Sequence, residues 1–228
     1  MYILAGLPFI APDYSSAWLL KDVQMEYLQE KFDKKGLMIL YTAPWPGQGF
    51  YTKFPVNSVS DFSGKKLRIY STATQQMGSM LGFNATILPF AEIPQAFSTG
   101  LIEALFTSPQ TGIDIQAWDN TKHFTYAGAI FSKNAVVVTK KAFNALSKGD
   151  QSNMLAAAKK AELRGWEMSA ETTKKQIGIL KKNGMSSKNA PDEVISKMKS
   201  IGLEMMKNWR SKASPEANAV LDRYLSMR

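Results

Sequence analysis

Hydrophobic and polar residues alternate in the middle of the chain in the manner of short strands joined by helices. In the segment 66–70, Leu67 and Ile69 point to one side of a predicted strand and Arg68 points to the other. The pattern continues through a helix at 73–81, a strand at 84–88, a helix at 90–99 and a strand at 101–107. Strands and helices in this order, with short connections, predict a parallel sheet with right-handed crossovers.

The flanking segments supply the remaining predicted elements. An unbroken apolar run at 37–42 predicts a strand covered on both faces, as in a parallel sheet. The segment 43–51 is so rich in proline and glycine that we expect a loop. Helices are predicted at 14–35, 111–124, 150–182, 191–209 and 214–226, and a strand at 134–139. The helix at 150–182, with Ser147 as its cap, is too long for one face of a small domain, so we expect it to brace two lobes.

Arg68 fits the hydrophobic pattern least well. It lies in the middle of a predicted covered strand, where an unpaired guanidinium is costly, and it is the only arginine among the first 163 residues. A guanidinium is a rigid, permanently charged, two-pronged donor, which the lysine ammonium is not. The residues alone leave two roles open, namely an ion pair with Glu92 or Glu103 and a clamp on the carboxylate of a ligand.

The predicted sheet also indicates where a ligand would bind. Ligands of open α/β sheets collect beyond the carboxyl ends of the strands. The residues predicted there include Tyr70, Thr72, Phe90, Thr107 and Ser108. The helix that follows Thr72 adds a positive helix end, which is worth about 0.3–1 kcal/mol to an anion.

Two other segments contribute candidate residues. Trp45, Gln48 and Tyr51 lie in the predicted loop 43–51, and loops carry binding sites on rigid scaffolds. Trp118 lies in the predicted helix 111–124. These aromatic residues are either pocket walls or core packing, and for Phe90 we expect core packing.

Composition narrows the possible functions. With 45% hydrophobic and 21% charged residues, the 228-residue chain has the composition of an ordinary globular protein. It has no cysteine, which excludes disulfides and thiolate chemistry, and a single histidine, His123, so we expect no metal centre and no cofactor. No apolar run approaches the length of a membrane span, so we expect no membrane insertion.

Charge and sequence motifs also bear on two other classes of protein, nucleic-acid-binding proteins and enzymes. The net charge of +9 allows an alternative, a basic protein that binds nucleic acid or an anionic surface and has no transport role. The lysines are spread along predicted helices, as on solvated faces, so we expect no nucleic-acid partner. An enzyme is not predicted, because no nucleophile accompanies Asp114, Asp119 and His123.

Several blocks of sequence resemble one family in the same order. They are Asp61-Phe-Ser-Gly-Lys-Lys-Leu-Arg-Ile-Tyr, the stretch from Leu81-Gly-Phe-Asn to Leu101-Ile-Glu-Ala, and Ser132-Lys-Asn-Ala-Val-Val-Val-Thr. The chain resembles, over essentially its whole length, the solute-binding subunits of tripartite ATP-independent periplasmic (TRAP) transporters. These proteins form the DctP family and are often labelled C4-dicarboxylate-binding.

The resemblance implies a fold and a division into lobes. The implied fold is α/β and two-lobed, like type II periplasmic binding proteins, with parallel or mixed sheets, hinge strands and the long bracing helix. Lobe I would hold residues 1–54 and 134–165, and lobe II residues 55–133 and 166–228. The family normally begins with a signal peptide and a further strand-helix-strand portion, whereas Met1 here falls inside the pattern. We therefore expect a chain truncated at its amino end and without a signal peptide.

The resemblance also implies a function. The protein would capture an organic acid in the periplasm by hinge closure and deliver it to a sodium-coupled membrane permease. Arg68 would pair with the ligand carboxylate, and Thr107 or Ser108 would assist. Many members carry a second arginine in the stretch that matches 46–53, but this chain has none there. Because a second carboxylate without a cation stays desolvated, we expect a monocarboxylate with a hydroxyl, keto or ring-bearing tail, unless Lys53 reaches inward.

Overall fold

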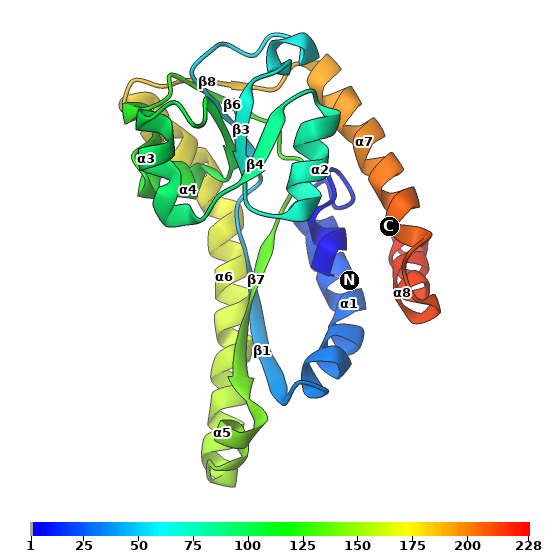
Figure 1. Cartoon of the computed structure of the whole chain (residues 1–228). Coiled ribbons are helices and arrows are strands. Elements are labelled where there is room, and N and C mark those ends of the chain that lie inside the picture. Colours follow the sequence, from blue (N-terminus) through cyan, green and yellow to red (C-terminus); the bar gives the residue numbers. More distant parts are fainter. Residues whose placement is uncertain (1) are drawn as a thin grey trace.

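The computed structural model describes residues 2–228, which form two β-sheets and the helices around them (Figure 1). The larger sheet has six strands in the order β4-β3-β5-β2-β6-β8. Their bounds are β2 (Gly49–Thr52), β3 (Lys66–Ile69), β4 (Asn84–Ile87), β5 (Ala104–Thr107), β6 (His123–Tyr126) and β8 (Ser186–Asn189). Strand β2 is antiparallel to both of its neighbours and the other neighbouring pairs are parallel, so β2 alone runs in the opposite direction.

The smaller sheet is a long antiparallel ribbon of β1 (Leu37–Pro44) and β7 (Lys133–Thr139). Helix α6 (Lys148–Lys182) packs along β1 and also contacts β8 of the larger sheet. Figure 1 shows α6 running beside the ribbon from α5 (Lys140–Asn144) up to the larger sheet. The 35-residue helix therefore packs against both sheets.

The other helices cover the larger sheet and the ribbon. They are α1 (Tyr14–Asp33), α2 (Thr72–Met80), α3 (Ile93–Ser98), α4 (Pro109–Asp114), α7 (Asp192–Arg210) and α8 (Pro215–Ser226). Short 3-10 helices occur at η1 (Tyr2–Gly6), η2 (Val59–Phe62), η3 (Phe90–Glu92) and η4 (Ala117–Asp119). Several α-helices begin with a residue whose side chain accepts a hydrogen bond from the first turn. These caps include Asp13 for α1, Ser71 for α2 and Ser147 for α6.

Hydrophobic residues are buried on both faces of the larger sheet. Successive residues of a strand point to opposite faces, so Phe50 and Tyr51 of β2 belong to two different clusters. The Phe50 ring packs against Phe62 and Phe106, with ring centroids 4.9 and 4.8 Å apart. The Tyr51 ring packs against Phe124 on the other face, at 4.5 Å. The central strand is thus held between two apolar layers.

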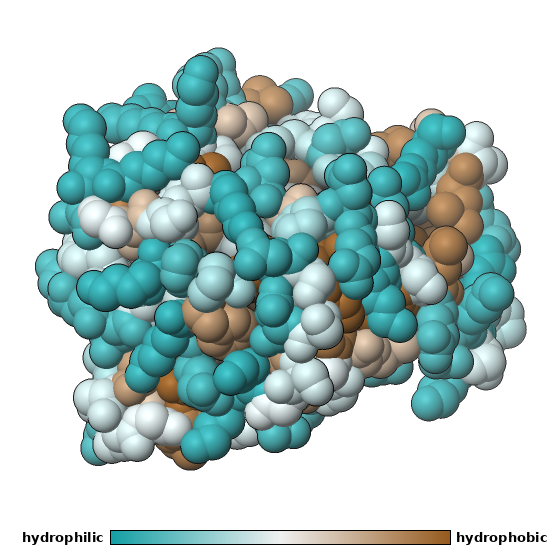
Figure 2. Space-filling model, turned by 90° about the horizontal axis from the view of Figure 1, so that it is seen from above, coloured by the Kyte–Doolittle hydropathy of each residue, from teal (hydrophilic) through white to brown (hydrophobic). Residues whose placement is uncertain are grey.

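The surface facing the viewer in Figure 2 is mainly hydrophilic, with hydrophobic residues in separate patches. Lysine side chains of α6 also belong to the exposed surface of the protein. The lysines at 159, 160, 174, 175, 181 and 182 are all exposed. This distribution agrees with the prediction that the lysines lie on solvated faces.

Much of the predicted architecture is confirmed. The α/β fold class, the parallel β3, β4 and β5 with α2 and α3 between them, and the long helix with Ser147 as its cap are all present. The division into lobes remains a prediction. The larger sheet does include β2, which belongs to the segment 1–54 that we assigned to lobe I.

Three predictions of local structure were wrong, and one strand was missed. The segment 43–51 is not a loop throughout, because β1 extends to Pro44 and β2 begins at Gly49. The apolar strand at 37–42 is antiparallel and only partly covered. The predicted helix 111–124 consists of α4, η4 and β6, since the backbone of Gln116 is left-handed (φ 49°) and stops the helix. Strand β8 was missed because its sequence, Ser-Ser-Lys-Asn, has no apolar alternation.

Candidate functional site

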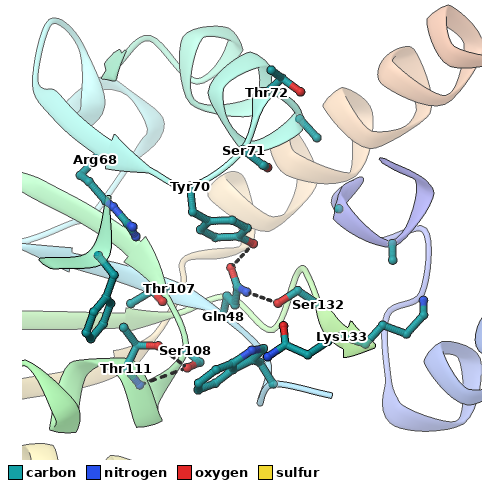
Figure 3. Close-up of a pocket in the computed structure, with 16 residues that line it drawn as sticks. Gln48, Arg68, Tyr70, Ser71, Thr72, Thr107, Ser108, Thr111, Ser132 and Lys133 are labelled. Atoms are coloured by element: carbon teal, nitrogen blue, oxygen red, sulfur yellow. Dashed lines mark hydrogen bonds between the residues drawn. The ribbon is translucent and has the colours of Figure 1, made fainter. Parts of the chain in front are cut away.

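A cavity of about 400 Å³ lies where the strand ends of the larger sheet meet the ribbon (Figure 3). Its walls come from segments that are far apart in the sequence. The lining residues are Ala5, Gly6, Trp45, Gln48, Arg68, Tyr70, Ser71, Thr72, Ala73, Phe90, Thr107, Ser108, Thr111, Ser132, Lys133 and Asn134. The site therefore has polar groups from both sheets.

The reversed direction of β2 explains how the segment 45–48 enters the site. Gly49, the first residue of β2, pairs with Thr107 at the carboxyl end of β5 and with Tyr126 at the carboxyl end of β6. The residues just before β2 therefore lie at the same edge of the sheet as the residues just after β3 and β5. The position of Gly49 is also crowded, because a Cβ atom there would lie 2.5 Å from the carbonyl oxygen of Thr125.

Arg68 is a buried cation, with only 5% of its surface exposed. Its Nε atom donates to the carbonyl oxygen of Leu88 at 3.0 Å. Among residues 2–228 no carboxylate lies within ion-pair distance of it, and Glu103 instead accepts the backbone N–H of Lys66. The ion pair with Glu92 or Glu103 is therefore not formed, and the terminal N–H groups of Arg68 are available to a ligand.

The electrostatic state of Arg68 follows from this burial. Desolvation lowers the pKa of the guanidinium below its ordinary value, and nearby Tyr70 acts in the opposite direction. Because arginine is effectively always protonated in proteins, the group stays charged at neutral pH. A desolvated cation without a carboxylate partner has a strong electrostatic preference for an anion.

A chain of hydrogen bonds crosses the middle of the cavity (Figure 3). The hydroxyl of Tyr70 donates to Oε1 of Gln48 at 2.8 Å, and Nε2 of Gln48 donates to Oγ of Ser132 at 2.9 Å. Burial raises the pKa of Tyr70 to about 12, so its hydroxyl is protonated at neutral pH. The chain joins β3, the start of β2 and the start of β7, and so joins both sheets.

Several other polar residues of the cavity lie at the starts of helices. Ser71 caps α2 by accepting the backbone N–H of Thr74, and Thr72 is the first residue of that helix. Ser108 likewise accepts the backbone N–H of Thr111 at 3.2 Å, while Thr107 ends β5 beside it. The start of α2 adds its positive helix end to the charge of Arg68.

Of the predicted site residues, eight line the cavity and two do not. Trp45, Gln48, Arg68, Tyr70, Thr72, Phe90, Thr107 and Ser108 line it. Phe90 is 52% exposed at the cavity, so the core packing that we expected for it was wrong. Tyr51 is fully buried, with its hydroxyl donating to the carbonyl oxygen of Ser108, because alternation along β2 directs it into the core. Trp118 packs against the same hydrophobic cluster as Tyr51.

Sequence reasoning missed the contribution of β7. Ser132 and Lys133 line the cavity, but the predicted strand began at Asn134 and no signal marked the two residues before it. Lys133 donates from Nζ to Oε1 of Gln24 on α1 at 3.2 Å. Lys53, the lysine that we considered as a second cation, donates to the carbonyl oxygen of Phe97 and does not line the cavity.

Lys133 should make the stability of the protein depend on pH in the alkaline range. Desolvation, together with the positive charge of Lys21, lowers its pKa from 10.5 to about 8. Between these values the unfolded chain holds a proton that the folded chain has released, so the free energy of unfolding should rise with pH. Denaturant unfolding of the wild type and of Lys133→Met, at about pH 7 and about pH 10, isolates this contribution. The wild type should gain stability relative to the variant at the higher pH, and a difference that does not change with pH would contradict the assignment.

No group of three or more histidine, cysteine, aspartate or glutamate residues within 2–228 could hold a metal ion. In the same range, every helix is too short or too polar to cross a membrane.

Comparison with known proteins gives three findings. The family model of bacterial extracellular solute-binding proteins, family 7 (DctP), matches residues 1–212. The solved extracytoplasmic solute receptor DctP7 of Bordetella pertussis, which binds pyroglutamic acid, is 37% identical with a TM-score of 0.93. The match covers 96% of this chain and 72% of that one. A TRAP solute-binding protein from a marine metagenome, solved with co-purified pyroglutamate, is 32% identical with a TM-score of 0.91, over 98% of this chain and 74% of that one.

A curated relative is more distant. A solute-binding protein of Chromohalobacter salexigens is 25% identical over 181 residues, which are 75% of this chain. The match spans 53% of the length of that relative, or about half of it.

Proposed function

The chain belongs to the DctP family, family 7 of the bacterial extracellular solute-binding proteins, and we propose that it is the solute receptor of a TRAP transporter. In this proposal Arg68 holds the carboxylate of an organic acid. The observation that carries it is the buried guanidinium in a cavity wall, with no carboxylate of residues 2–228 beside it. The family and the solved relatives named above are binding proteins and not enzymes.

For the ligand, we propose a monocarboxylate with a small ring, of which pyroglutamate is the model compound. Two receptors of Bordetella pertussis and one from a marine metagenome, at 37%, 35% and 32% identity, bind pyroglutamate. The charges of the cavity support the same class. Lys53 is directed to Phe97 and does not line the cavity, whereas Lys133 lines it but donates from Nζ to Gln24. We therefore assign one carboxylate to Arg68, and a second carboxylate would have to compete with Gln24 for Lys133 to find a cation.

The remaining parts of the proposal concern place and partners. A receptor of this family works outside the cytoplasm, and we place it in the periplasm, where it would pass its ligand to the membrane permease of the transporter. The binding motion would be a hinge closure around the ribbon of β1 and β7. A ligand that touches Arg68 on the larger sheet and Ser132 on the ribbon would favour the closed state, because it gains contacts only there. Neither the family nor the solved relatives support the alternative of a nucleic-acid-binding protein.

Thermal unfolding with a panel of acids tests the function and the ligand class together. Pyroglutamate should raise the melting temperature most, because a ligand at 1,000 times its Kd stabilises the folded state by about 4 kcal/mol. In a protein of this size, each kcal/mol of stabilisation raises the melting temperature by about 2–4 °C. Succinate and malate should give smaller shifts at equal concentration. A larger shift by these dicarboxylates would reject the monocarboxylate, and the absence of a shift with every acid would reject the receptor function.

A further inference from the structure

We propose that the end of the chain, at helix α8, is a latch on the hinge between the two sheets. The latch consists of two hydrogen bonds to the carbonyl oxygen of Ile10, from the hydroxyl of Tyr224 at 2.7 Å and from Nη1 of Arg228 at 3.2 Å. It holds the sheets in the arrangement in which both of them line the cavity. Its effect on ligand affinity rests on the proposed function, whereas its effect on the arrangement of the sheets does not.

The loop at Pro8, residues 7–13, is one place where the chain crosses from the larger sheet to the ribbon. Before the loop, η1 packs against α2, which covers β3 and β4 of the larger sheet. After the loop, α1 packs against β1 of the ribbon, and its Lys21 is ion-paired with Glu162 of α6. Hinges are a few loop residues that absorb changes in backbone angles. A rotation of one sheet relative to the other would therefore bend the loop at Pro8.

The C-terminal segment crosses between the same two parts of the molecule. Helix α7 packs against α2 and η2, on the side of the larger sheet, and α8 packs against α1. Figure 1 shows α7 running down from the larger sheet to α8. Only residues 211–214 separate the two helices. The bonds from Tyr224 and Arg228 to Ile10 thus fasten one crossing of the chain to the other.

The backbone of the loop at Pro8 depends on such attachments. Phe9 is left-handed (φ 57°), a conformation that a residue with a large side chain keeps only where its surroundings impose it. Its N–H donates to the carbonyl oxygen of Ala129 at 2.7 Å, and Nζ of Lys199 on α7 lies 5.8 Å or less from its ring centre, at 5.6 Å. The next residue, Ile10, accepts both bonds of the latch. Without the latch, the loop could relax to an ordinary backbone, and the start of α1 would shift with it.

Burial makes the latch bonds costly to break. The side chain of Tyr224 is completely buried, and Ile10 is also buried. Burial raises the pKa of Tyr224, so its hydroxyl is protonated at neutral pH and can donate. A buried carbonyl oxygen that loses its donors is left unsatisfied. The arrangement with the latch formed is therefore favoured over one in which α8 and the loop have moved apart.

The latch acts on the cavity from outside it. Tyr224 and Arg228 are not lining residues, but Ala5 and Gly6 of η1, which precede the loop at Pro8, do line the cavity. Ser132 lines it from the ribbon. The ligand would be bound by molecules in which these walls meet, and the apparent affinity is proportional to the fraction of such molecules. A latch that raises this fraction therefore strengthens binding without contacting the ligand.

The arrangement of the sheets can be measured without a ligand, because the chain contains no cysteine. Lys122→Cys, just before β6, and Lys141→Cys, in α5 at the far end of the ribbon, would carry two spin labels at exposed positions (Figure 1). Pulsed electron–electron double resonance should give a narrow distribution of distances with the latch intact. The distribution should broaden when Tyr224→Phe and Arg228→Met are combined. Identical distributions would overturn the proposal.

Calorimetric titration with pyroglutamate tests the effect on binding. The combined variant should bind about 3- to 10-fold more weakly than the wild type, because two hydrogen bonds no longer favour the competent arrangement. Tyr224→Phe alone, which keeps the aromatic ring and the bond from Arg228, should show a smaller loss in the same direction. It also serves as the test if the combined variant does not fold.

Thr121→Val is the matched control for the loss of a buried hydroxyl. The hydroxyl of Thr121 donates to the carbonyl oxygen of Ala117 at 2.8 Å, and neither residue lies at a crossing. The control should lower the melting temperature but change neither the affinity nor the distances. An unchanged affinity in the latch variants, or an equal loss in the control, would overturn the effect on binding. If no protein bound pyroglutamate, the proposed ligand would be rejected, and the distances alone would decide on the latch.

Discussion

Replacing Arg68 with alanine should greatly weaken ligand binding while the protein remains folded. The guanidinium pairs with a carboxylate through parallel charge-assisted hydrogen bonds. Truncating one partner of a buried charge pair costs about 2–5 kcal/mol, so we expect at least a 30-fold loss of affinity for pyroglutamate. Arg68→Lys should also bind weakly, because the ammonium cannot reproduce the two-pronged geometry.

The fold should tolerate the loss of Arg68 for a physical reason. The change removes a desolvated charge, and the one internal hydrogen bond that it breaks, from Nε to the carbonyl oxygen of Leu88, contributes about 1 kcal/mol. Lys53→Ala is the matched control, because Lys53 is a cation of a neighbouring segment that does not line the cavity. Isothermal titration of Arg68→Ala, Arg68→Lys and Lys53→Ala with pyroglutamate measures the three affinities. An unchanged affinity in Arg68→Ala would exclude the clamp.

Gly202→Ala should destabilise the protein, although glycine-to-alanine changes inside helices normally stabilise. Gly202 lies within α7, and a Cβ atom at this position would overlap the carbonyl oxygen of Pro8. Because the obstacle is backbone, the loop at Pro8 has to move away from α7. Overpacking of this kind costs about 1–3 kcal/mol, or a fall of several degrees in melting temperature.

A second glycine in a helix provides the control for this effect. Gly178 lies in α6, and no atom would lie within 4 Å of an added Cβ. Gly178→Ala should therefore stabilise by about 0.5–1 kcal/mol, as helix propensity predicts. Denaturant unfolding of both variants measures the difference. If Gly202→Ala proved as stable as Gly178→Ala, the close packing of α7 on the loop at Pro8 would be incorrect.

The loop at Pro8 also connects this prediction to the binding site. It joins η1 to α1, and Ala5 and Gly6 of η1 line the cavity. The backbone N–H of Phe9 donates to the carbonyl oxygen of Ala129, so the loop is attached to the segment that leads into β7. A shift of the loop in Gly202→Ala should therefore also weaken ligand binding, which the same titrations would detect.

Elements with a local cause could be predicted from the order of the residues. The alternation of Leu67, Arg68 and Ile69 predicted β3, and the apolar periodicity and Ser147 predicted the long helix α6. The chemistry of Arg68 was also visible, because a lone arginine in a covered strand is costly unless something pairs with it. These inferences needed only periodicity, capping and charge.

The assembly of the cavity depends on long-range contacts that local patterns do not reveal. The reversed direction of β2 brings Gln48 to the same edge as Arg68, and β7 brings Ser132 and Lys133 from more than sixty residues away in the sequence. The prolines and glycines around β2 predicted a loop. The strand forms because it pairs with β5 and β6, and not because its own residues favour a strand. The sequence could likewise not show that no carboxylate of residues 2–228 lies within ion-pair distance of Arg68. Strand pairing joins residues that are far apart in the sequence. The residues that line the cavity with Arg68 could therefore be identified only from the folded sheet.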